Sequence, residues 1–455
     1  MSLQRSLTRE QLADTFSASV GVGTAELVGI EVENGLVDQA TGCSVPYGGE
    51  HGAQGLLDAV VREFNGNPLF DGAYAIGVAL PNGARFTLET GGALEYASKP
   101  SASLVQAVHI ARADLAQVAA VAERVGIALL SGGCLPFTPK RNIPWIPKPR
   151  VRAMLDYFER LGEPGEHAEA VMGLTLSTQT SLDYLSSQDF IEKMRLHVLA
   201  APVVAALFVN SPIADGGYCG ALSRRMQYWQ KFDPRRCGLL GFALNENPSV
   251  VDLVDWAIRL PMIYRQVAGS HVAAPDRPFA DLMDTGFGDG TWPTYADWEL
   301  HLCQLWPHVR PRRTLELRAS DGLPWPYFSA APAIWVGLTY DKIARKEATT
   351  VLSEITPHQL ERSIDDIAVK GLAASVGPYQ VGDLAHELLR LARQGLDNRV
   401  AANIDPPEIL SYLEPLEKVD ETGETFADSC AMLWQGELGQ SPEAYVKKFR
   451  VSFDQ

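Results

Sequence analysis

Several common signals are missing from this sequence, and each absence removes a class of protein. The 455 residues contain no C-x-x-C pair among six scattered cysteines, which excludes zinc ribbons and thioredoxin-like redox motifs. They contain no G-x-x-x-x-G-K-[ST] loop, no H-E-x-x-H helix and no G-x-S-x-G elbow. These gaps exclude P-loop nucleotide hydrolases, zincin metalloproteases and α/β-hydrolases. The chemistry of this chain therefore does not rest on the commonest phosphate-binding or nucleophile motifs.

Long hydrophobic runs are also missing. The longest run covers residues 199–209, contains Pro202 and has about half of the roughly 20 residues that a bilayer span needs. The first 16 residues lack the apolar core of a signal peptide and carry acidic residues. We therefore expect a cytoplasmic protein that does not contact a membrane. Its cysteines are expected to be reduced and to serve as small buried hydrophobes.

Cationic residues are scarce. The chain has 39 Lys and Arg against 55 Asp and Glu, so its net charge is −16 at pH 7. Nucleic acids and anionic membranes are polyanions, and this balance excludes them as the main partner. A small anionic ligand stays possible because a basic pocket can lie inside an acidic surface. Hydrophobic residues make up 46% of the chain, which is typical of a packed globular protein and not of a disordered one.

Four segments alternate polar and apolar residues with the period of a β-strand, at 27–33, 85–89, 175–183 and 314–318. The simplest interpretation is a half-exposed antiparallel sheet with its polar face in solvent. Carboxylates, however, recur on the polar face, and acids packed side by side repel one another unless a cation lies between them. Mg²⁺ prefers carboxylate and phosphate oxygens, so the pattern predicts a metal–nucleotide site on the sheet. The candidate metal ligands are Glu31, Glu33, Glu89, Glu95 and Glu316.

Basic residues gather in a few short segments, at 148–152, 224–225, 235–236 and 310–318. In the first of these, Lys148, Arg150 and Arg152 are expected to alternate along a loop. A single Arg is usually a solvated surface residue, but clusters this local in an acidic chain indicate a pocket for phosphate or carboxylate groups. If residues 222–229 form a helix, Arg225 and Trp229 are neighbours on one face and can stack.

Other segments have the apolar spacing of helices, namely 50–65, 103–124, 190–208, 357–369 and 382–395. Strands and helices interleave without a strict βαβ repeat, which predicts the α+β class with an antiparallel sheet. No strong linker is present, so we expect one catalytic domain over residues 1–455. It would comprise an N-terminal helical segment at 1–23, the sheet and its helices at 24–402, and a C-terminal helical tail at 403–455.

A series of short motifs runs in order along almost the whole chain, from about residue 29 to residue 441. They are G-x-E-x-E at 29–33, L-E-x-G-G-x-x-E at 88–95, I-P-x-x-P-K-x-R at 143–150, S-x-Q-x-x-L-D at 177–183, N-S-P at 210–212, L-S-x-R-x-x-x-W at 222–229, R-x-G at 236–238, D-W-E-x-H-L at 297–302, R-x-L-E-x-R-x-x-D-G-x-P-W at 313–325, P-A-x-W-V-G-L-x-Y-D at 332–341 and G-E-x-G-Q-S at 436–441. Through these motifs the chain resembles the glutamate–cysteine ligase family, in its plant and proteobacterial branch.

The resemblance implies a fold and a reaction. The fold would be a curved antiparallel sheet that forms a funnel, with helices outside, related to glutamine synthetase. The reaction would use ATP to phosphorylate the γ-carboxylate of L-glutamate, after which the amine of a small L-amino acid attacks the acyl phosphate. Carboxylates would hold Mg²⁺ against the ATP phosphates, and Arg and Lys would neutralise the transferred phosphoryl group.

The matched motifs also assign site residues. The five acids named above become the metal ligands, and Arg225 and Arg318 become catalytic residues. The ATP-binding residues would be Lys148, Arg150 and Arg236. The residues that bind the amino-acid substrates would be Gln179, Ser181, Asn210 and Trp229.

The departures from the family pattern fall where the acceptor amino acid would be chosen. Ser181 stands where the family has Asn, and Leu174 stands where it has Arg at the start of the same segment, on its opposite face. Cysteine is the default acceptor, as in glutathione biosynthesis. A small non-thiol amino acid, such as propargylglycine in secondary metabolism, is the alternative. The ergothioneine-pathway ligases are a third, more distant resemblance, and a catalytically silent regulatory homologue is a fourth interpretation. The oligomeric state is expected to be a monomer or a homodimer.

Overall fold

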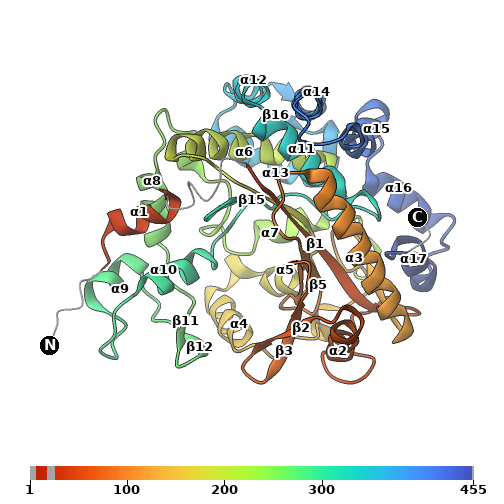
Figure 1. Cartoon of the computed structure of the whole chain (residues 1–455), viewed down its shortest axis with the longest axis horizontal. Helices are drawn as coiled ribbons and strands as arrows, with labels where there is room; N and C mark the ends of the chain where they lie inside the picture. The colour runs from red at the N-terminus through yellow and green to blue at the C-terminus, as the bar shows by residue number, and fades with distance from the viewer. Residues whose placement is uncertain (1–6, 18–25, 453–455) are drawn as a thin grey trace.

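The computed structural model describes residues 7–17 and 26–452, and the centre of this part is a nine-stranded antiparallel sheet (Figure 1). The long strand β1 lies in the middle and pairs with three neighbours. The spatial order is β14 (Val309–Pro311), β15 (Leu315–Leu317), β7 (Thr178–Leu182), β1 (Val28–Asp38), β5 (Leu94–Ala97), β4 (Arg85–Leu88), β3 (Tyr74–Ala79) and β2 (Asn67–Asp71), with β6 (Ile127–Leu130) paired to the second half of β1.

The two faces of this sheet differ in polarity because side chains alternate along each strand. The back face carries apolar residues such as Ile30, Phe86, Tyr96 and Leu317, all of which are buried. The front face carries the carboxylates. The rings of Phe86 and Tyr96, paired across β4 and β5, lie 5.3 Å apart between centroids, so aromatic cross-strand packing adds to the burial that holds these strands together.

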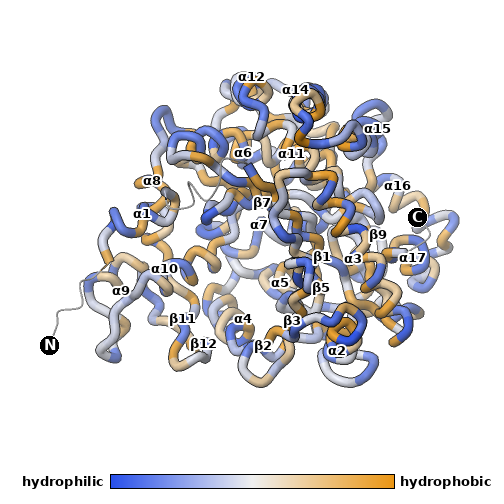
Figure 2. Tube along the Cα trace, viewed as in Figure 1, coloured by the Kyte–Doolittle hydropathy of each residue, from blue (hydrophilic) through white to orange (hydrophobic). Residues whose placement is uncertain are grey.

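Several long helices pack against the back face of the sheet and extend the core beyond it (Figure 1). Hydrophobic residues lie mostly inside the molecule, whereas the outer turns are hydrophilic (Figure 2). The helices are α1 (Arg9–Ser17), α2 (Ala53–Phe64), α3 (Leu104–Arg124), α4 (Pro149–Leu161), α5 (Ala168–Leu174), α6 (Ser187–Leu207), α7 (Arg224–Gln230), α8 (Val250–Ile258), α9 (Phe279–Thr285), α10 (Tyr295–Leu302), α11 (Ala330–Tyr340), α12 (Lys342–Leu352), α13 (Pro357–Lys370), α14 (Val381–Ala401), α15 (Glu414–Thr422), α16 (Phe426–Gln435) and α17 (Pro442–Phe449).

Helix α6 explains the longest hydrophobic run of the sequence. Its second half is buried on all sides between the sheet and the helices α12, α13 and α14. A helix that is apolar all round belongs inside a protein, and Pro202 is accommodated there. Among the residues that the structure describes, no helix is both long enough and apolar enough to span a bilayer.

The front face is enclosed by smaller elements. Helices α7 and α10 and the hairpin of β11 (Tyr264–Val267) and β12 (Ser270–Ala273) surround it, and α4 packs against that hairpin. The remaining short strands form three ribbons: β8 (Ile213–Ala214) with β9 (Gly217–Tyr218), β10 (Cys237–Gly238) with β13 (Trp306–Pro307), and β16 (Ser375–Val376) with β17 (Tyr379–Gln380).

The structure confirms the predicted α+β class, the four polar-faced strands and the five predicted helices. Two local predictions were wrong. Leu174 ends helix α5 and is buried, so it does not lie on a strand. Residues 148–152 do not alternate along a loop, because Pro149 begins helix α4 and turns Arg152 outward to pair with Asp156 at 2.8 Å. Part of the predicted N-terminal segment 1–23 lies outside the described residues.

Candidate active site

The predicted metal ligands meet on the front face because of the strand register. Glu33 of β1 lies opposite Glu95 of β5, and Glu31 lies opposite Gln179 of β7. On the other side of β7, Ser181 lies opposite Glu316 of β15. We call Glu31, Glu33, Glu89, Glu95 and Glu316 the acidic patch.

Glu89 reaches the patch through a tight turn between β4 and β5. Its backbone carbonyl accepts a hydrogen bond from Gly92, whose φ of +91° is a left-handed conformation that favours glycine. Gly91 packs so closely on Gly173 of α5 that a Cβ would lie 2.2 Å from its Cα. The two glycines of the L-E-x-G-G motif therefore shape the turn that carries Glu89.

Burial and mutual repulsion favour the protonated forms of three acids in the patch. Burial raises the pKa of Glu31 to about 7, with a further contribution from the charge of Glu316. Burial and the charge of Glu89 raise the pKa of Glu33 to about 7 as well. The pKa of Glu95 is raised well above its usual value by burial and by its carboxylate neighbours. A bound cation would remove this repulsion.

Glu316 behaves differently because two guanidinium groups hold it. Arg310, its partner across the β14–β15 hairpin, donates to both carboxylate oxygens at 2.8–3.1 Å. Arg318 donates to the same carboxylate. Burial alone would raise the pKa of Glu316, but these charges outweigh it and lower the pKa to about 2.

Gln179 joins the acidic and the basic parts of the site. Its amide nitrogen donates to Glu33 at 3.1 Å and its amide oxygen accepts from Arg318 at 2.6 Å. Ser177 donates to the second oxygen of Glu33 at 2.8 Å. The polar face that the alternation predicted is thus one hydrogen-bonded network that runs from β1 to β15.

Helix α7 supplies Arg225 and Trp229. Ser223 caps the helix by accepting a hydrogen bond from the backbone of Met226. The Arg225 guanidinium donates to the backbone carbonyls of Arg318 at 2.8 Å and Ala319 at 3.2 Å. The Trp229 ring lies 5.7 Å from the Arg225 guanidinium and 5.9 Å from that of Arg318, which confirms the predicted stacking.

A small cavity of about 20 Å³ lies between these side chains. It is lined by Arg225, Trp229, His308 and Arg318, and each has a buried nitrogen without a hydrogen-bond partner in the described part of the chain: Nε of both arginines, Nε1 of Trp229 and Nδ1 of His308. Burial lowers the pKa of His308 to about 4, so its ring is neutral. Unpaired buried donors next to two guanidiniums suit an anionic group.

Asp321 lies behind this basic cluster and anchors it. Its carboxylate accepts from the Ser211 hydroxyl at 2.6 Å, the Ser223 hydroxyl at 2.9 Å and the Asn210 backbone at 3.0 Å. Gly133 leaves room for it, since a Cβ there would lie 2.6 Å from the carboxylate. The capping residue of α7 is therefore tied to the loop that follows β15.

Lys148 and Arg150 lie on the opposite side of the patch from β15. Lys148 is buried and donates to the carbonyl of Leu88, the residue before Glu89. Burial and the charge of Arg150 lower the pKa of Lys148 to about 8, while Glu89 opposes that shift. Arg150, in the first turn of α4, is only partly buried.

The structure does not bring two of the predicted site residues to the patch. Arg236 is fully buried and donates to Asp233 at 3.1 Å and to the backbone carbonyl of Pro261, so its guanidinium holds the fold together. Asn210 is also buried, and its amide donates to Gly322 at 2.8 Å. A sequence motif does not distinguish a residue that binds a ligand from one that stabilises the folded chain.

Sequence reasoning also missed roles for residues that the structure brings in. Arg310 was only one member of a basic cluster, although a hairpin at 309–317 would have placed it opposite Glu316. Asp321 was noted only as part of a motif. His308 carried no signal, because nothing in its neighbourhood in the sequence points to Trp229 on α7.

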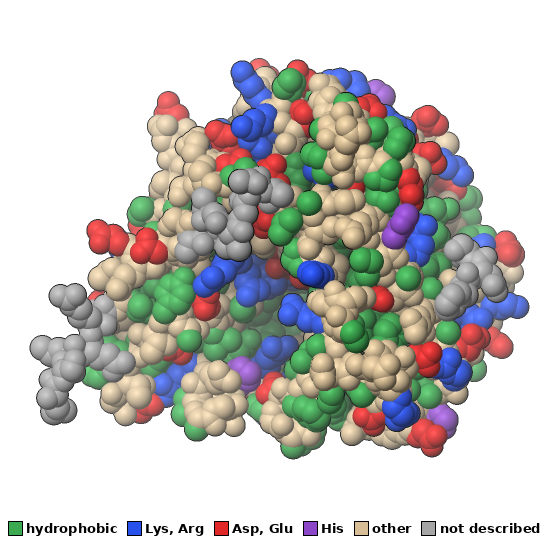
Figure 3. Space-filling model, viewed as in Figure 1, with side chains coloured by type: hydrophobic (Ala, Val, Ile, Leu, Met, Phe, Trp, Pro, Cys, Tyr) green, Lys and Arg blue, Asp and Glu red, His purple; other side chains and the backbone are tan. Residues whose placement is uncertain are grey.

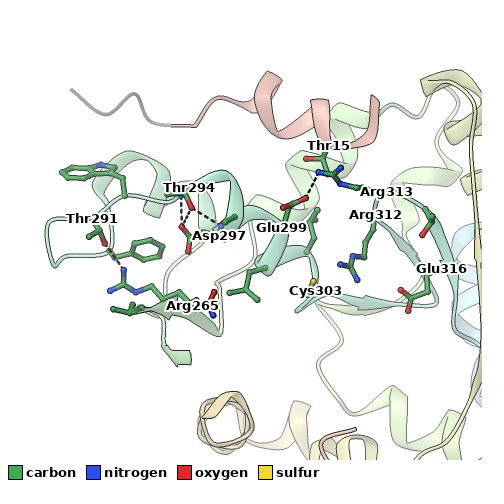
Figure 4. Close-up of a pocket in the computed structure, with 18 of the residues that line it drawn as sticks. Thr15, Arg265, Thr291, Thr294, Asp297, Glu299, Cys303, Arg312, Arg313 and Glu316 are labelled. Carbon is green, nitrogen blue, oxygen red and sulfur yellow. Dashed lines mark hydrogen bonds and ion pairs between the residues drawn. The ribbon is translucent and has the colours of Figure 1, made fainter. Parts of the chain in front are cut away.

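A larger pocket opens from the acidic patch toward solvent between β15, α10 and the β11–β12 hairpin (Figure 4). Its volume is about 790 Å³, and Glu31, Ser181 and Glu316 form its inner end. Lys and Arg side chains gather around a hollow in the middle of this face of the molecule (Figure 3). We call the pocket between β15, α10 and the β11–β12 hairpin the outer pocket.

The donor set of the acidic patch fits Mg²⁺ that is bound together with phosphates. No three His, Cys, Asp or Glu side chains in residues 7–17 and 26–452 are arranged to hold a metal ion alone. Mg²⁺ seldom uses such all-protein cages and takes one or two carboxylates with waters and substrate phosphates instead. Glu31, Glu33, Glu89 and Glu95 supply oxygens without cationic partners, whereas both oxygens of Glu316 are already engaged.

Comparison with known proteins agrees with this geometry. The model of the family described as glutamate–cysteine ligase family 2 (GCS2) matches residues 27–444. The chloroplastic glutamate–cysteine ligase of Brassica juncea is 33% identical over 392 residues, which cover 85% of this chain and 74% of the relative. The corresponding enzyme of Arabidopsis thaliana is 32% identical over 392 residues, with 85% and 72% covered.

Two solved structures share the fold at 13% identity. The glutamate–cysteine ligase of Francisella tularensis in complex with AMP has a TM-score of 0.53 and covers 93% of this chain and 86% of its own. The bifunctional glutathione synthetase of Pasteurella multocida has a TM-score of 0.52 and covers 97% of this chain and 53% of its own. The chain therefore belongs to glutamate–cysteine ligase family 2 and is an ATP-dependent γ-glutamyl ligase.

Proposed function

We propose that this enzyme phosphorylates the γ-carboxylate of L-glutamate with ATP and then joins it to the amine of a small L-amino acid. The observation that carries this proposal is the contact between an acidic patch and a basic cluster on one sheet face, linked by Gln179. In the second step the amine nitrogen forms a bond to the γ-carbonyl carbon and the carbon–oxygen bond to phosphate breaks. The phosphate leaves with that electron pair; of the two protons that the ammonium loses, one goes to phosphate and one to solvent.

The phosphates of ATP would lie over the acidic patch, between Lys148 and Arg318. Glu31, Glu33, Glu89 and Glu95 would hold Mg²⁺, which when bound neutralises the negative charge that phosphates and carboxylates share. Lys148 donates to the carbonyl of Leu88, next to Glu89, and would attract the same phosphates together with Arg150. Arg318, which already spans Glu316 and Gln179, would stabilise charge on the transferred group.

L-Glutamate would bind between the acidic patch and helix α7. Arg225, Arg318, Trp229 and His308 line one small cavity and have unpaired buried nitrogens, and a carboxylate is the anion that suits guanidinium donors. Gln179 and Ser177 fix Glu33 next to this place. The γ-carboxylate would therefore be held where the metal-bound phosphate arrives.

Cysteine is the default acceptor, because it is the acceptor named for the Brassica and Arabidopsis relatives. Ser181 favours the alternative of a small non-thiol amino acid. It lines the outer pocket beside Glu316, at the place where the family has a larger amide side chain. The cytoplasmic location and a monomeric or homodimeric state stay predictions.

The test is ADP release with ATP, Mg²⁺ and L-glutamate, combined in turn with cysteine and a panel of small non-thiol L-amino acids. We expect ADP release only when an acceptor is present, and a γ-glutamyl dipeptide of the expected mass. A clear preference for a non-thiol amino acid would reject cysteine as the acceptor. Absence of ADP release with every acceptor would reject the ligase proposal and favour the silent homologue.

A further inference from the structure

The outer pocket has carboxylates at its inner end and side chains of both charges farther out. Its inner end is formed by the carboxylates of Glu31 and Glu316 with Ser181 between them, and Glu31 forms no hydrogen bond or ion pair through its carboxylate within the described residues. Three arginines lie farther out along the same pocket, at positions 265, 312 and 313. Asp289, Asp297 and Glu299 line this outer part as well, so a cation is available to a ligand only where an arginine is left unpaired.

Two of these three arginines are already paired. Arg265 donates to Thr291 at 2.9 Å and pairs with Asp289, while its guanidinium lies 4.1 Å from the Phe287 ring. Arg313 pairs with Glu299 of α10 at 3.0 Å. These contacts stabilise the pocket wall. They also engage the guanidinium groups of Arg265 and Arg313, which are therefore less available to a ligand.

Arg312 differs from its neighbours. Within residues 7–17 and 26–452 its side chain has no hydrogen bond, ion pair or ring contact, although its backbone is held by Thr314 and Tyr184. Arg312 and Arg313 leave the same turn and diverge, Arg313 toward Glu299 and Arg312 into the pocket beside Cys303 (Figure 4). Its charge is close enough to contribute to the lowered pKa of Glu316.

We propose that the outer pocket is the acceptor site and that Arg312 binds the α-carboxylate of the acceptor amino acid. A zwitterion complements this pocket: its carboxylate pairs with Arg312, and its amine points inward to the acidic patch, where the γ-glutamyl phosphate forms. A guanidinium group matches a carboxylate with two parallel donors. Ser181 at the inner end leaves space for the acceptor side chain.

The position of Arg312 favours the acceptor over ATP as its ligand. The cations beside Glu89, Lys148 and Arg150, lie on the β4 side of the patch, whereas Arg312 follows β14 on the other side. A phosphate chain held by Lys148 would reach the patch from β4, and the acceptor amine would arrive from the opposite direction. The enzyme would then require a free α-carboxylate on its acceptor, whatever the acceptor side chain is.

This inference rests on the proposed ligase function, and the experiment keeps the two apart. The KM values for acceptor, L-glutamate and ATP are measured by ADP release for the unmodified enzyme, Arg312→Gln, Arg312→Lys and the control Arg313→Gln. The acceptors are L-cysteine and L-2-aminobutyrate, together with L-2-aminobutyramide, which lacks the carboxylate. Circular dichroism and thermal melting show that each variant is folded.

We expect Arg312→Gln to raise the acceptor KM about 10-fold or more, as expected for loss of a charge-assisted pair, and to change the other two KM values less than about twofold. Arg312→Lys should lie in between and Arg313→Gln should match the unmodified enzyme. L-2-Aminobutyramide should be a poor acceptor for the unmodified enzyme, and Arg312→Gln should use it no better and no worse than the unmodified enzyme does. A rise in the ATP KM alone would assign Arg312 to phosphate and overturn the proposal, as would equal use of the amide and the acid by the unmodified enzyme. If the unmodified enzyme releases no ADP with any acceptor, the ligase proposal itself fails, and the assignment of Arg312 is overturned with it.

Discussion

Asp321→Asn is the substitution that tests most directly how the basic cluster is held in place. The carboxylate of Asp321 accepts hydrogen bonds from two hydroxyls and one backbone N–H, and it lies 3.9 Å from the Arg225 guanidinium. An asparagine has the same shape but only one acceptor oxygen, so at least one donor is left facing an NH₂ group. Hydrogen bonds to a charged group contribute about 1.5–3 kcal/mol each, and we expect a loss of about 2–3 kcal/mol in unfolding free energy.

The same change should weaken the binding of L-glutamate. Asp321 holds Ser223, the N-cap of α7, and the Ser211 hydroxyl accepts from the Arg225 backbone at 3.1 Å. Once this support is weakened, Arg225 no longer has a fixed position. We expect the KM for L-glutamate to rise about 10-fold or more, which corresponds to about 1.4 kcal/mol or more. The KM for ATP should change by less than about twofold, because Lys148 lies on the other side of the patch.

The matched control is Asp405→Asn. Asp405 is similarly buried, accepts from Ser103 at 2.7 Å and from the Val105 backbone at 3.0 Å, and pairs with Arg399, but it anchors α3 and α14 instead of α7. The Asp405→Asn substitution should lower the unfolding free energy measured by chemical denaturation by a similar amount and leave every KM unchanged. If both variants raise the glutamate KM equally, or if folded Asp321→Asn keeps the original KM, Asp321 does not position Arg225 and the reasoning is refuted.

Four further predictions follow from particular contacts. Glu89→Gln should abolish ADP release without lowering the melting temperature, and retained turnover would remove Glu89 from the metal ligands. The folded-state pKa of Glu31 is raised from 4.5 to about 7, so between these pH values the folded state binds more protons than the unfolded state. The contribution of Glu31 should therefore make the ligand-free enzyme less stable as the pH rises from about 4.5 to about 7. Above about pH 7 Glu31 should cause no further loss. Glu31→Gln should flatten that dependence in denaturant titrations from pH 5 to pH 8, and an unchanged slope would contradict the assignment. Gly337→Ala should destabilise by about 1–3 kcal/mol, because its Cβ would lie 2.2 Å from a carbonyl of α14, whereas Gly241→Ala, which points into open space, should be near neutral in the same melts. Ser181→Asn should change the ratio of kcat/KM between cysteine and non-thiol acceptors by about 10-fold, because an amide there would fill the inner end of the outer pocket. The KM for ATP should stay unchanged. Equal effects on all acceptors would show that Ser181 does not select the acceptor.

The polar face of the sheet could be predicted from the sequence because it depends on local periodicity. Glu31 and Glu33 are two residues apart, and any extended backbone places them on one side. The same rule placed Gln179 with Ser181, and Glu316 with Arg318. Helix periodicity predicted the stacking of Arg225 with Trp229 in the same way.

Contacts between distant segments could not be predicted in this way. Arg236 and Arg318 both lie within motifs that match the family, yet one is fully buried against Asp233 and the other reaches Gln179. Whether an arginine binds a ligand or stabilises the folded chain depends on which elements pack around it. That is decided by helices and loops that come from elsewhere in the chain.

The sequence by itself determined the class of fold, the acidic face of the strands and, through the ordered motifs, the family. These properties follow from alternation and spacing, which act over a few residues. Only the tertiary structure decided that Glu316 is neutralised by Arg310 and Arg318, that Asp321 supports α7, and that Arg312 stands unpaired in the outer pocket. The physical reason is that charge pairing and burial depend on distances of a few ångströms between segments far apart in the chain, and packing alone sets those distances.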